Sequence, residues 1–302
     1  MESKSPYLVL NPASAGGKTG RRQKEIIRAV ERQFGPVILL LTEKNAAVSA
    51  EASDGGVILV SGGDGTIQHV VNAFLQKGSP GLSSPELAIL SSGTGCGFAQ
   101  SLGIPRGLER QVRIAASGRA RAIDVGKLEY TQFNGARAMR YFINECQLGI
   151  GAEVVRRVEG GAKRAGGRLT FGLATLQSVF RHRNQAMTVT TDGIRHEGTF
   201  CGVTVANGPR MGGGMNLVPG ASMEDHRLDI LIMGDLSVGQ RVRAFPGIYS
   251  GSHVRRRGFS LRQARHVTIH SNLPVTIAAD GEVLGTTPCT IDVMPAAIRV
   301  RR

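Results

Sequence analysis

Residues 61–66 combine glycine and aspartate in a way that suits phosphate chemistry. An apolar stretch leads into Gly62, Gly63, Asp64 and Gly65, with Thr66 next. Glycine lets a backbone turn sharply and approach a ligand closely, and the amides that open a following helix can face a phosphate. A carboxylate there binds Mg²⁺ better than phosphate. The run predicts a nucleotide-phosphate turn with a metal-directed acid, although many strand-to-helix turns share this composition.

Two further glycine-bearing loops could meet the same ligand. The first contains Gly16, Gly17 and Lys18 but lacks the spacing of a Walker A loop. An ordinary capped helix start remains open for it. The second contains Gly93 and Thr94. We expect it to lie beside residues 62–66 if the preceding strands are neighbours, because ligands of parallel sheets bind at the carboxyl ends of strands.

Three other acids are candidates. Asp124 lies near a change of pattern in the chain, where it could join Asp64 in holding Mg²⁺ or be an exposed turn residue. Asp280 and Glu282 flank Gly281. Asp–Gly is a common hairpin signal, and spacing alone favours a plain turn. In a catalytic interpretation, Glu282 takes a proton from a hydroxyl and Asp280 supports it.

The elements that must position these residues fall into two groups. Up to residue 124, strand-like and helix-like segments alternate, which predicts a mainly parallel sheet covered by helices. The expected strands are 7–10, 37–41, 57–60 and 87–90, and the expected helices are 21–34, 46–52 and 67–75. From residue 125, strands separated by turn signals predict a mostly antiparallel, sandwich-like domain. Its expected strands are 141–143, 187–191, 199–205, 228–233, 267–269, 275–278 and 290–293, interrupted by one helix at 169–180.

We therefore predict an α/β plus β architecture. Domain 1 covers residues 1–124, and domain 2 covers residues 125–293. We expect the active site in a cleft between them. The length of 302 residues allows two such domains.

Composition limits the partners. The formal charge of +14 favours polyanionic ones: nucleotide, nucleic acid or an anionic membrane surface. The four cysteines lie far apart and form no CxxC pair, which argues against a zinc or redox motif and for reduced thiols in the cytoplasm. Neither a secretion signal nor an apolar run of transmembrane length is evident, so any membrane contact is expected to be peripheral.

The ordered set of motifs resembles the diacylglycerol kinase catalytic-domain family, which also contains sphingosine and ceramide kinases. The matching motifs are Asn11–Pro12 with Gly16–Gly17, residues 62–66, residues 93–94 leading into 98–105, residues 142–144 with 149–152, residues 212–215 with 219–221, residues 225–229, and residues 280–282. Residues 62–66 are shared with NAD kinases. The full ordered set covers nearly the whole chain and is specific for the lipid-kinase branch.

This resemblance implies a kinase that transfers the γ-phosphoryl group of ATP to a lipid hydroxyl with Mg²⁺, most simply to diacylglycerol or a related lipid. It implies nucleotide contacts from Asn11, Thr42, Gly63, Thr66 and Thr94. It further implies that Asp64 and Asp124 organise Mg²⁺ and that Glu282 is the general base. The resemblance also implies that the strands at about 294–302 return to domain 1. Asp225 and Leu228 would form a separate structural Mg²⁺ site, although His226 stands where the family usually has glycine.

One departure keeps alternatives open. Where the family has Asn–Asp, this chain has Cys96–Gly97. Loss of one carboxylate could weaken catalysis, so a weakened lipid- or nucleotide-binding relative remains an alternative. A kinase of a soluble dinucleotide or polyol is another. The sequence leaves the acceptor lipid and the oligomeric state open, a homodimer included.

Two basic clusters suit an anionic membrane surface. They are residues 156–168, with Arg156, Arg157, Lys163, Arg164 and Arg168, and residues 241–265, with seven arginines. Each basic residue near an anionic bilayer contributes about 1 kcal/mol. Nucleic-acid binding is the competing interpretation, but the clusters have no stacking aromatics and no nucleic-acid motif. We therefore expect a cytoplasmic protein at the inner face of the membrane.

Overall fold

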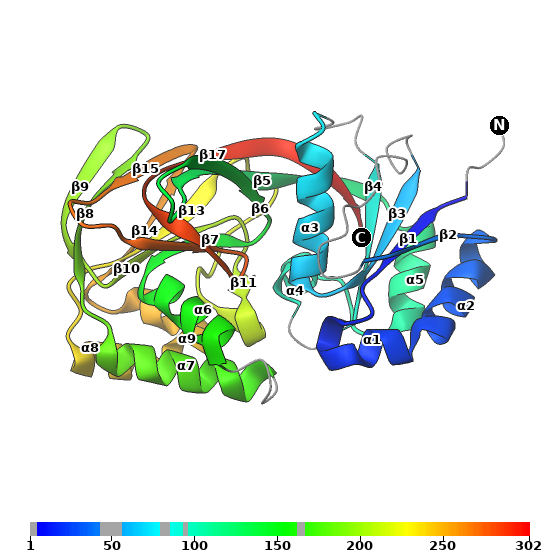
Figure 1. Cartoon of the computed structure of the whole chain (residues 1–302), viewed down its shortest axis with the longest axis horizontal. Coiled ribbons are helices and arrows are strands. Elements are labelled where there is room, and N and C mark those ends of the chain that lie inside the picture. The colour runs from blue at the N-terminus through cyan, green and yellow to red at the C-terminus, as the bar shows by residue number, and fades with distance from the viewer. Residues whose placement is uncertain (1–4, 43–55, 79–84, 93–95, 162–166) are drawn as a thin grey trace. The chain divides into compact units, whose positions relative to one another are not determined.

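A computed structural model describes residues 5–42, 56–78, 85–92, 96–161 and 167–302 (Figure 1). The chain divides into two compact units. Unit 1 comprises residues 1–124 and 295–302, and unit 2 comprises residues 125–294. The expected helix at 46–52 and the candidates Gly93 and Thr94 lie outside the described residues.

Unit 1 is a parallel α/β layer. Its elements are β1 (Tyr7–Leu10), η1 (Ser14–Gly17), α1 (Lys18–Arg21), α2 (Gln23–Phe34), β2 (Ile38–Leu41), β3 (Val57–Gly62), α3 (Asp64–Leu75), β4 (Glu86–Ser91), α4 (Gly97–Ser101) and α5 (Leu108–Ser117). The strand order is β4-β3-β1-β2, and all three pairs are parallel. The carboxyl ends of these strands therefore lie at one edge of the sheet.

The alternating pattern of unit 1 follows from its buried side chains. Helices α2 and α5 pack on one face of the strands, where Ile26, Val30 and Val112 meet Leu8 and Leu59 in one apolar core. Helix α3 lies on the other side of the strands (Figure 1). The predicted helix at 21–34 is interrupted in the structure, because α1 ends at Arg21 and α2 begins at Gln23.

The last strand of the chain returns to unit 1. Strand β17 (Glu282–Arg301) pairs in parallel with β4 through Arg299 and Val300. Two ion pairs hold this register, since Glu86 accepts from Arg299 at 2.6 Å and from Arg301 at 2.7 Å. Strand β5 (Ala120–Thr131) runs from unit 1 into unit 2.

Unit 2 is rich in antiparallel strands. Its elements are β6 (Arg137–Phe142), β7 (Glu145–Gly149), α6 (Ile150–Gly161), α7 (Gly167–Arg181), β8 (Gln185–Thr191), β9 (Ile194–Phe200), β10 (Gly202–Ala206), β11 (Arg210–Met211), η4 (Gly212–Gly214), β12 (Met215–Asn216), β13 (Leu228–Met233), α8 (Val238–Ala244), α9 (Gly247–Ser250), η5 (Ser252–Arg255), β14 (Phe259–Ala264), β15 (His266–His270) and β16 (Thr276–Ala279). The main strand order is β14-β13-β10-β7-β16-β17, and the remaining strands extend from β17 through β15, β8 and β9, and through β5 and β6.

The strands of unit 2 enclose an apolar core that includes Leu128, Phe142, Val203, Ile230 and Ile277. Helices α6, α7, α8 and α9 lie together on one side of these strands (Figure 1). The single strand predicted at 199–205 is wrong, because Cys201 separates β9 from β10. Its amide donates to the carbonyl of Met233 at 2.9 Å instead of continuing the β8–β9 ladder.

Candidate functional site

The carboxyl edge of the unit 1 sheet gathers the first group of predicted residues. Asn11 follows β1, Thr42 follows β2, and the glycine turn follows β3. Ser92 follows β4, and its amide donates to the carbonyl of Gly62 at 3.1 Å. The loop after β4 therefore begins beside the glycine turn, as expected for neighbouring parallel strands.

Asn11 and Thr66 are joined at this edge. The Asn11 amide group donates to Thr66 Oγ1 at 3.0 Å, and Asn11 Oδ1 accepts from the amide of Ala13 at 3.0 Å. A Cβ atom at Gly62 would lie 2.4 Å from Thr66 Oγ1, so only glycine fits there. Thr42 Oγ1 is buried and has no hydrogen-bond partner among the described residues. The Thr42 hydroxyl is therefore a polar group at this edge that a ligand could hydrogen-bond.

The glycines of the two described loops are explained by different causes. Gly16 and Gly17 have φ angles of 66° and 81°, so the backbone conformation itself favours glycine there. Gly63 has a φ of −102°, which any residue adopts, and Gly65 is not in the left-handed region either. A Cβ at Gly63 or Gly65 would meet none of the described atoms within 4 Å. Packing therefore does not account for these two glycines, whereas close approach of a ligand would.

A basic cavity lies at the same edge. It has a volume of about 220 Å³ and is lined by Lys18, Arg22 and Arg106 together with the serines at 61, 91 and 92. Arg22 is partly neutralised by Glu25, whose carboxylate accepts two bonds from it at 2.8 Å. Sequence reasoning identified Lys18 but missed Arg22 and Arg106. Arg106 directly precedes Gly107, the N-cap residue of α5, and a cation there gave no motif signal.

Asp64 is the first residue of α3, and its carboxylate is bound to the start of α4. Oδ2 accepts from the amide of Gly97 at 2.8 Å, and Oδ1 accepts from the amide of Phe98 at 3.0 Å and from Cys96 Sγ at 3.2 Å. Burial raises the pKa of the Cys96 thiol well above its usual range, and the neighbouring Asp64 carboxylate adds to this shift. Asp64 thus positions α4 and keeps spare acceptor capacity mainly on Oδ2.

Asp124 is fully buried in unit 1. Its Oδ1 accepts from the amide of Ala296 at 2.7 Å, and Ala296 has a left-handed φ of 51°. This buried carboxylate therefore stabilises the left-handed backbone conformation at Ala296, which lies within β17. The alternative that Asp124 is an exposed turn residue is therefore wrong.

Asp280 and Glu282 lie in unit 2, at the turn between β16 and β17. The Asp280 carboxylate accepts from the amides of Ile143, Asn144 and Glu145 at 2.7, 2.8 and 3.2 Å. The amide of Asp280 donates back to the carbonyl of Glu145 at 3.0 Å. These bonds fasten the turn, which has a φ of 46° at Asp280, to the β6–β7 connection. The turn is more than a plain hairpin.

Glu282 lies directly after this turn, and its side chain stays accessible to solvent. Its side chain is 46% exposed, and Oε2 accepts from Arg140 Nη2 at 2.6 Å. Arg140 lies on β6 and is separated from Glu282 by 142 positions, so sequence spacing could not reveal the pair. A carboxylate with one oxygen paired and the other open can accept a proton from a hydroxyl group.

A second acidic pair lies at the start of β13. Gln263 donates to Asp225 Oδ2 at 3.2 Å and to Asp229 Oδ1 at 3.1 Å. Asp229 Oδ2 is buried without a hydrogen-bond partner among the described residues. Burial raises the pKa of Asp229, the Gln263 bond opposes the shift, and Asp225 adds to it. Two carboxylates with an unsatisfied buried oxygen fit a hard divalent cation. The predicted ligand Leu228 is itself buried, so only its carbonyl group could take part.

No group of three or more His, Cys, Asp or Glu side chains converges on a possible metal position within the described ranges. A cation at Asp225 and Asp229 would therefore need backbone or water oxygens as further ligands. At Asp64, a cation could likewise be bound only by Oδ2 or through a water molecule.

We expect Asp229→Asn to raise the melting temperature by about 2–4 °C in the absence of divalent cations, because it removes a buried charge of raised pKa. We expect millimolar Mg²⁺ to stabilise the parent protein, and we expect Asp229→Asn to abolish that stabilisation. Thermal unfolding with and without millimolar Mg²⁺ measures both effects, and Glu197→Gln, an exposed acid of β9, is the control. An undiminished Mg²⁺ response in Asp229→Asn would place the cation elsewhere.

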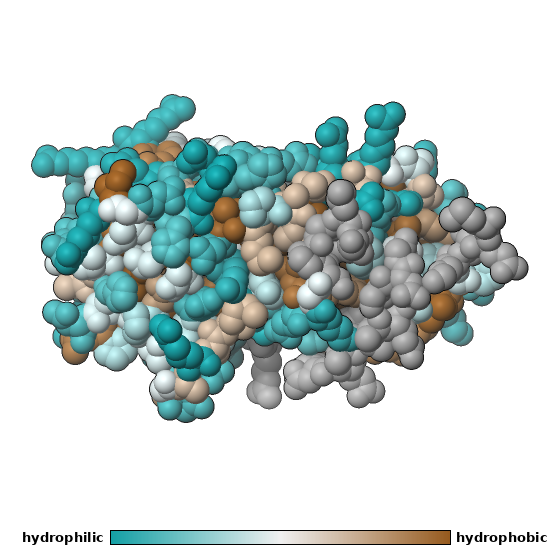
Figure 2. Space-filling view, turned by 90° about the horizontal axis from the view of Figure 1, so that it is seen from above, coloured by the Kyte–Doolittle hydropathy of each residue, from teal (hydrophilic) through white to brown (hydrophobic). Residues whose placement is uncertain are grey.

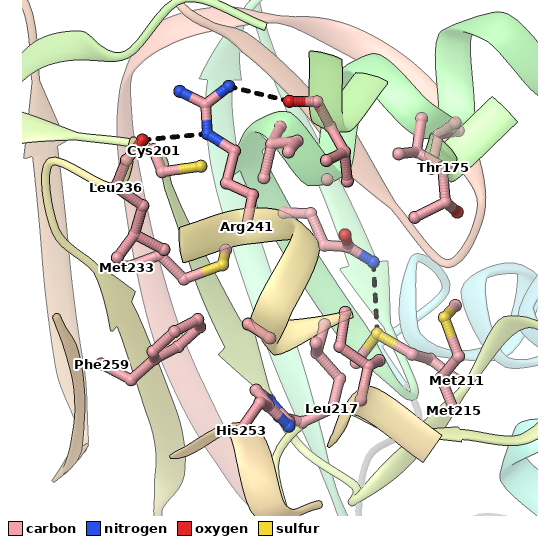
Figure 3. Close-up of a pocket in the computed structure, with 18 residues that line it drawn as sticks. Thr175, Cys201, Met211, Met215, Leu217, Met233, Leu236, Arg241, His253 and Phe259 are labelled. Carbon is pink, nitrogen blue, oxygen red and sulfur yellow. Dashed lines mark hydrogen bonds between the residues drawn. The ribbon is translucent and has the colours of Figure 1, made fainter. Parts of the chain in front are cut away.

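Unit 2 also contains an apolar cavity, lined by residues of α6, α7, α8 and α9 and of the strands beneath them (Figure 3). Its volume is about 90 Å³, and Met211, Met215, Met233 and Phe259 contribute to its wall. Flexible thioethers adapt readily to an irregular apolar ligand. Water would gain few partners in such a space.

The polar groups at the wall of the apolar cavity are directed to the protein itself. Arg241 donates to the carbonyls of Leu236 at 3.0 Å and Val179 at 3.2 Å (Figure 3). It also donates to the carbonyl of His182 at 2.8 Å. His253 is fully buried, with ring nitrogens 3.1 and 2.9 Å from two carbonyl oxygens, and burial lowers its pKa. Burial raises the pKa of the Cys201 thiol to about 11. The space itself is thus left to an apolar group.

Comparisons with known proteins decide the family. The model of the diacylglycerol kinase catalytic domain matches residues 5–128. The model of the YegS C-terminal NAD kinase beta sandwich-like domain matches residues 144–302, which is more than half of the chain. The chain belongs to the diacylglycerol kinase catalytic-domain family. As a member of this family it is a kinase, and the predicted family is confirmed.

Relatives of known name agree with this membership. The family member from Escherichia coli O127:H6 named "Probable lipid kinase YegS" is 29% identical over 99% of this chain and 96% of its own. The Bacillus subtilis protein named "Diacylglycerol kinase" is 28% identical over 81% of this chain and 77% of its own.

Two solved structures share the fold of this chain. A structure from Bacillus anthracis described as a diacylglycerol kinase has a TM-score of 0.71 at 19% identity, over 100% of this chain and 97% of its own. Yeast NADH kinase has a TM-score of 0.56 at 13% identity, over 98% of this chain and 82% of its own. The predicted fold class, a parallel α/β part with a β-rich second part, is confirmed.

Proposed function

We propose that this kinase transfers the γ-phosphoryl group of ATP to the hydroxyl group of a lipid, with diacylglycerol as the first acceptor class to test. The observation that carries the proposal is the apolar cavity of unit 2, which offers a lipid chain a wall of thioether and aromatic groups. The names of relatives as diacylglycerol and lipid kinases support the acceptor class. A soluble dinucleotide would leave this cavity without a purpose.

Unit 1 provides the nucleotide side of the proposal. The open space in front of Gly63 and Gly65 would let phosphates approach the backbone, and the three cations of the basic cavity would neutralise them. Thr42 and the Asn11–Thr66 pair would contact the nucleotide at the edge of the sheet. Gly93 and Thr94 remain part of this proposal.

Unit 2 provides the acceptor side and the base. Glu282 would take the proton of the lipid hydroxyl while the oxygen of that hydroxyl attacks the γ-phosphorus. The bond between this phosphorus and the oxygen that bridges it to ADP would then break. Arg140 orients the carboxylate, and Asp280 holds the turn. The products are the lipid phosphate, ADP and a proton.

Mg²⁺ would be held near Asp64 through Oδ2 or water, and when bound it neutralises charge on the phosphates. Asp124 would act on Mg²⁺ at longer range, because its carboxylate is buried. Asp225 and Asp229 would hold a second, structural cation, with the Leu228 carbonyl as a further ligand.

The location follows from the substrate. We place the protein in the cytoplasm as a peripheral protein on the anionic inner face of the membrane, with no nucleic-acid partner. No helix among the described residues is both long and apolar enough to cross a bilayer. A homodimer remains an open part of this proposal.

The departure at Cys96–Gly97 does not by itself favour the weakened relative. Both residues donate to Asp64, so they contribute to the local architecture of the glycine turn. Catalysis of phosphoryl transfer depends mostly on positioning and charge neutralisation, and Asp64, Asp124 and Glu282 are retained.

An assay with γ-labelled ATP, Mg²⁺ and mixed micelles containing diacylglycerol tests the proposal, with mass detection of the product. We expect label in the lipid, and we expect Ala244→Phe, which fills the apolar cavity, to lower kcat/KM for lipid about tenfold or more. Nucleotide affinity should not change. Ala186→Phe, at an exposed position of β8, is the control. Label appearing only in a water-soluble acceptor would overturn the lipid assignment.

A further inference from the structure

The outer sides of α7, α8 and α9 carry a group of exposed apolar side chains. We call this group the helical apolar face. Its members and their exposed fractions are Leu176 at 44%, Phe180 at 56%, Val238 at 40%, Val242 at 42% and Tyr249 at 47%. Side chains of this size are normally scattered singly over a protein surface, and a cluster marks an interaction site.

Helical spacing groups these residues within each helix. Leu176 and Phe180 are four positions apart on α7, and Val238 and Val242 are four positions apart on α8, so each pair shares one face of its helix. The helices form one layer of unit 2 (Figure 1), with α7 in contact with α8 and α8 in contact with α9. The strand side of unit 2, which carries β9 and β15, is mostly hydrophilic with scattered apolar side chains (Figure 2).

The same three helices line the apolar cavity on their inner sides. Val179 of α7, Ala244 of α8 and Ile248 of α9 face the cavity, while Phe180, Val242 and Tyr249, one or two positions away in sequence, face solvent. The layer between cavity and solvent is therefore one helix thick and has apolar side chains on both sides. Docking of this layer on a bilayer would therefore bring the apolar cavity close to the lipids.

The charge around the helical apolar face identifies its partner. Exposed arginines adjoin it at the end of α7, at positions 181 and 183, on α8 at position 243, and after α9 at positions 255, 256 and 257. Asp235 is the only acidic residue in the stretch 234–262. Apolar side chains together with cations on the same helices and on the segment after α9 complement a bilayer that has anionic headgroups. A second copy of the chain would instead bring arginine against arginine.

We propose that the helical apolar face is the docking surface of this kinase for an anionic lipid bilayer. This proposal deepens the proposed function and rests on it for its purpose, since docking would place the apolar cavity at its lipid source. The side chains of the helical apolar face enter the hydrocarbon layer of the bilayer, and the arginines pair with headgroup phosphates.

Co-sedimentation of the full chain with vesicles tests the surface directly, without reference to activity. The vesicles are phosphatidylcholine alone or phosphatidylcholine with phosphatidylglycerol. We expect Leu176→Asn with Phe180→Asn to weaken partitioning onto the anionic vesicles about tenfold or more. The triple change Arg255→Ser, Arg256→Ser and Arg257→Ser should weaken it about a hundredfold at low salt and less at high salt. Melting temperatures confirm that the variants fold.

The matched control is Phe133→Asn with Ile194→Asn, at the two exposed apolar positions of 67% and 65% on other parts of unit 2. Its binding should equal that of the parent. Equal loss in the control, full binding by the α7 variant, or a dimer that the α7 variant abolishes without any vesicle binding would each overturn the docking proposal. Kinase activity on a detergent-dispersed short-chain lipid should survive in both α7 and arginine variants. If that activity is absent in the parent, the proposed function fails while the vesicle result stands by itself.

Discussion

Replacement of Glu282 by glutamine is expected to lower the rate of phosphoryl transfer by about 10²–10⁴-fold, which is the usual contribution of a general base. Glutamine keeps the shape and can still contact Arg140, but it cannot take the proton of the acceptor hydroxyl. Nucleotide affinity, measured by titration with a fluorescent ATP analogue, should remain within about twofold of the parent, because Glu282 would act on the acceptor. A rate defect without a binding defect is the pattern that the base assignment requires.

The control for this prediction is Glu129→Gln. Glu129 lies on β5 of the same unit, is 44% exposed, and pairs with Lys127 at 2.7 Å, so it matches Glu282 in exposure and ion pairing. Glu129 does not lie beside an anchored turn like the one at Asp280, so Glu129→Gln should leave the rate unchanged. If Glu282→Gln transfers phosphate to lipid as fast as Glu129→Gln, the base lies elsewhere and the turn at Asp280 is architectural.

Arg140 provides a second view of the same geometry. Its change to alanine would free the Glu282 carboxylate to rotate while leaving it able to accept a proton. We therefore read Arg140 as a positioning residue, because its contact with the proposed base is a single ion pair at 2.6 Å. The sequence offered no signal for it, since β6 and β17 meet only through the folded sheet.

The alternating segments of unit 1 could be predicted because each has its own local pattern. Strands such as β3 are continuous apolar runs, and α2 has apolar residues at helical spacing, which is enough to identify buried parallel strands and their covering helices. The glycine turn also has a local signal. Its position beside the loop after β4 then follows from the parallel register of β3 and β4.

Elements defined by distant partners were harder to predict. Strand β17 has 20 residues, but only residues 290–293 have a clear strand pattern. Pro288 and Pro295 interrupt that pattern, and proline within a run usually argues against a central strand. The strand persists because successive parts of it pair with β16, β15 and β4. Helix α6 was missed because its first turn, with Gly151, looks like a loop motif.

Gly151 shows why that helix needs such a sequence. A Cβ atom at Gly151 would lie 1.9 Å from Gln147 Oε1, so glycine lets α6 lie close to β7 at this point. Helix propensity alone disfavours glycine, and the contact with a residue on the preceding strand outweighs it. Local sequence patterns contain no information on that contact.

The proposed roles of the four catalytic-site acids also illustrate what spacing leaves out. The sequence indicated acids at 64, 124, 280 and 282 but gave no hint that three of them accept backbone amides. Asp64 binds the start of α4, Asp124 binds the backbone of β17 at Ala296, and Asp280 binds the β6–β7 connection. Glu282 instead forms an ion pair with Arg140 and remains half exposed. This division separates the proposed base from three acids that hold the surrounding backbone.

Asp64→Ala is expected to lower the free energy of unfolding by about 2–5 kcal/mol, because the buried amides of Gly97 and Phe98 lose their acceptor. Asp64→Asn keeps one acceptor oxygen and should lose less than half as much. Urea unfolding followed by circular dichroism measures both variants. A loss below about 1 kcal/mol in Asp64→Ala would show that water replaces the carboxylate at α4 without penalty.

Cys96 reports on the same bond without any assay of activity. Its thiol is 4% exposed, and both burial and Asp64 raise its pKa, so it should react slowly with a thiol reagent in the parent protein. In Asp64→Ala the start of α4 is released and the carboxylate is gone, so labelling at Cys96 should accelerate about tenfold or more, located by mass spectrometry. Cys289 is buried in unit 2, with its pKa raised to about 12, and should label at an unchanged slow rate. Acceleration at Cys96 alone would tie the glycine turn to α4 as one structural element, whereas equal acceleration at both cysteines would indicate general unfolding and remove Asp64 from that role.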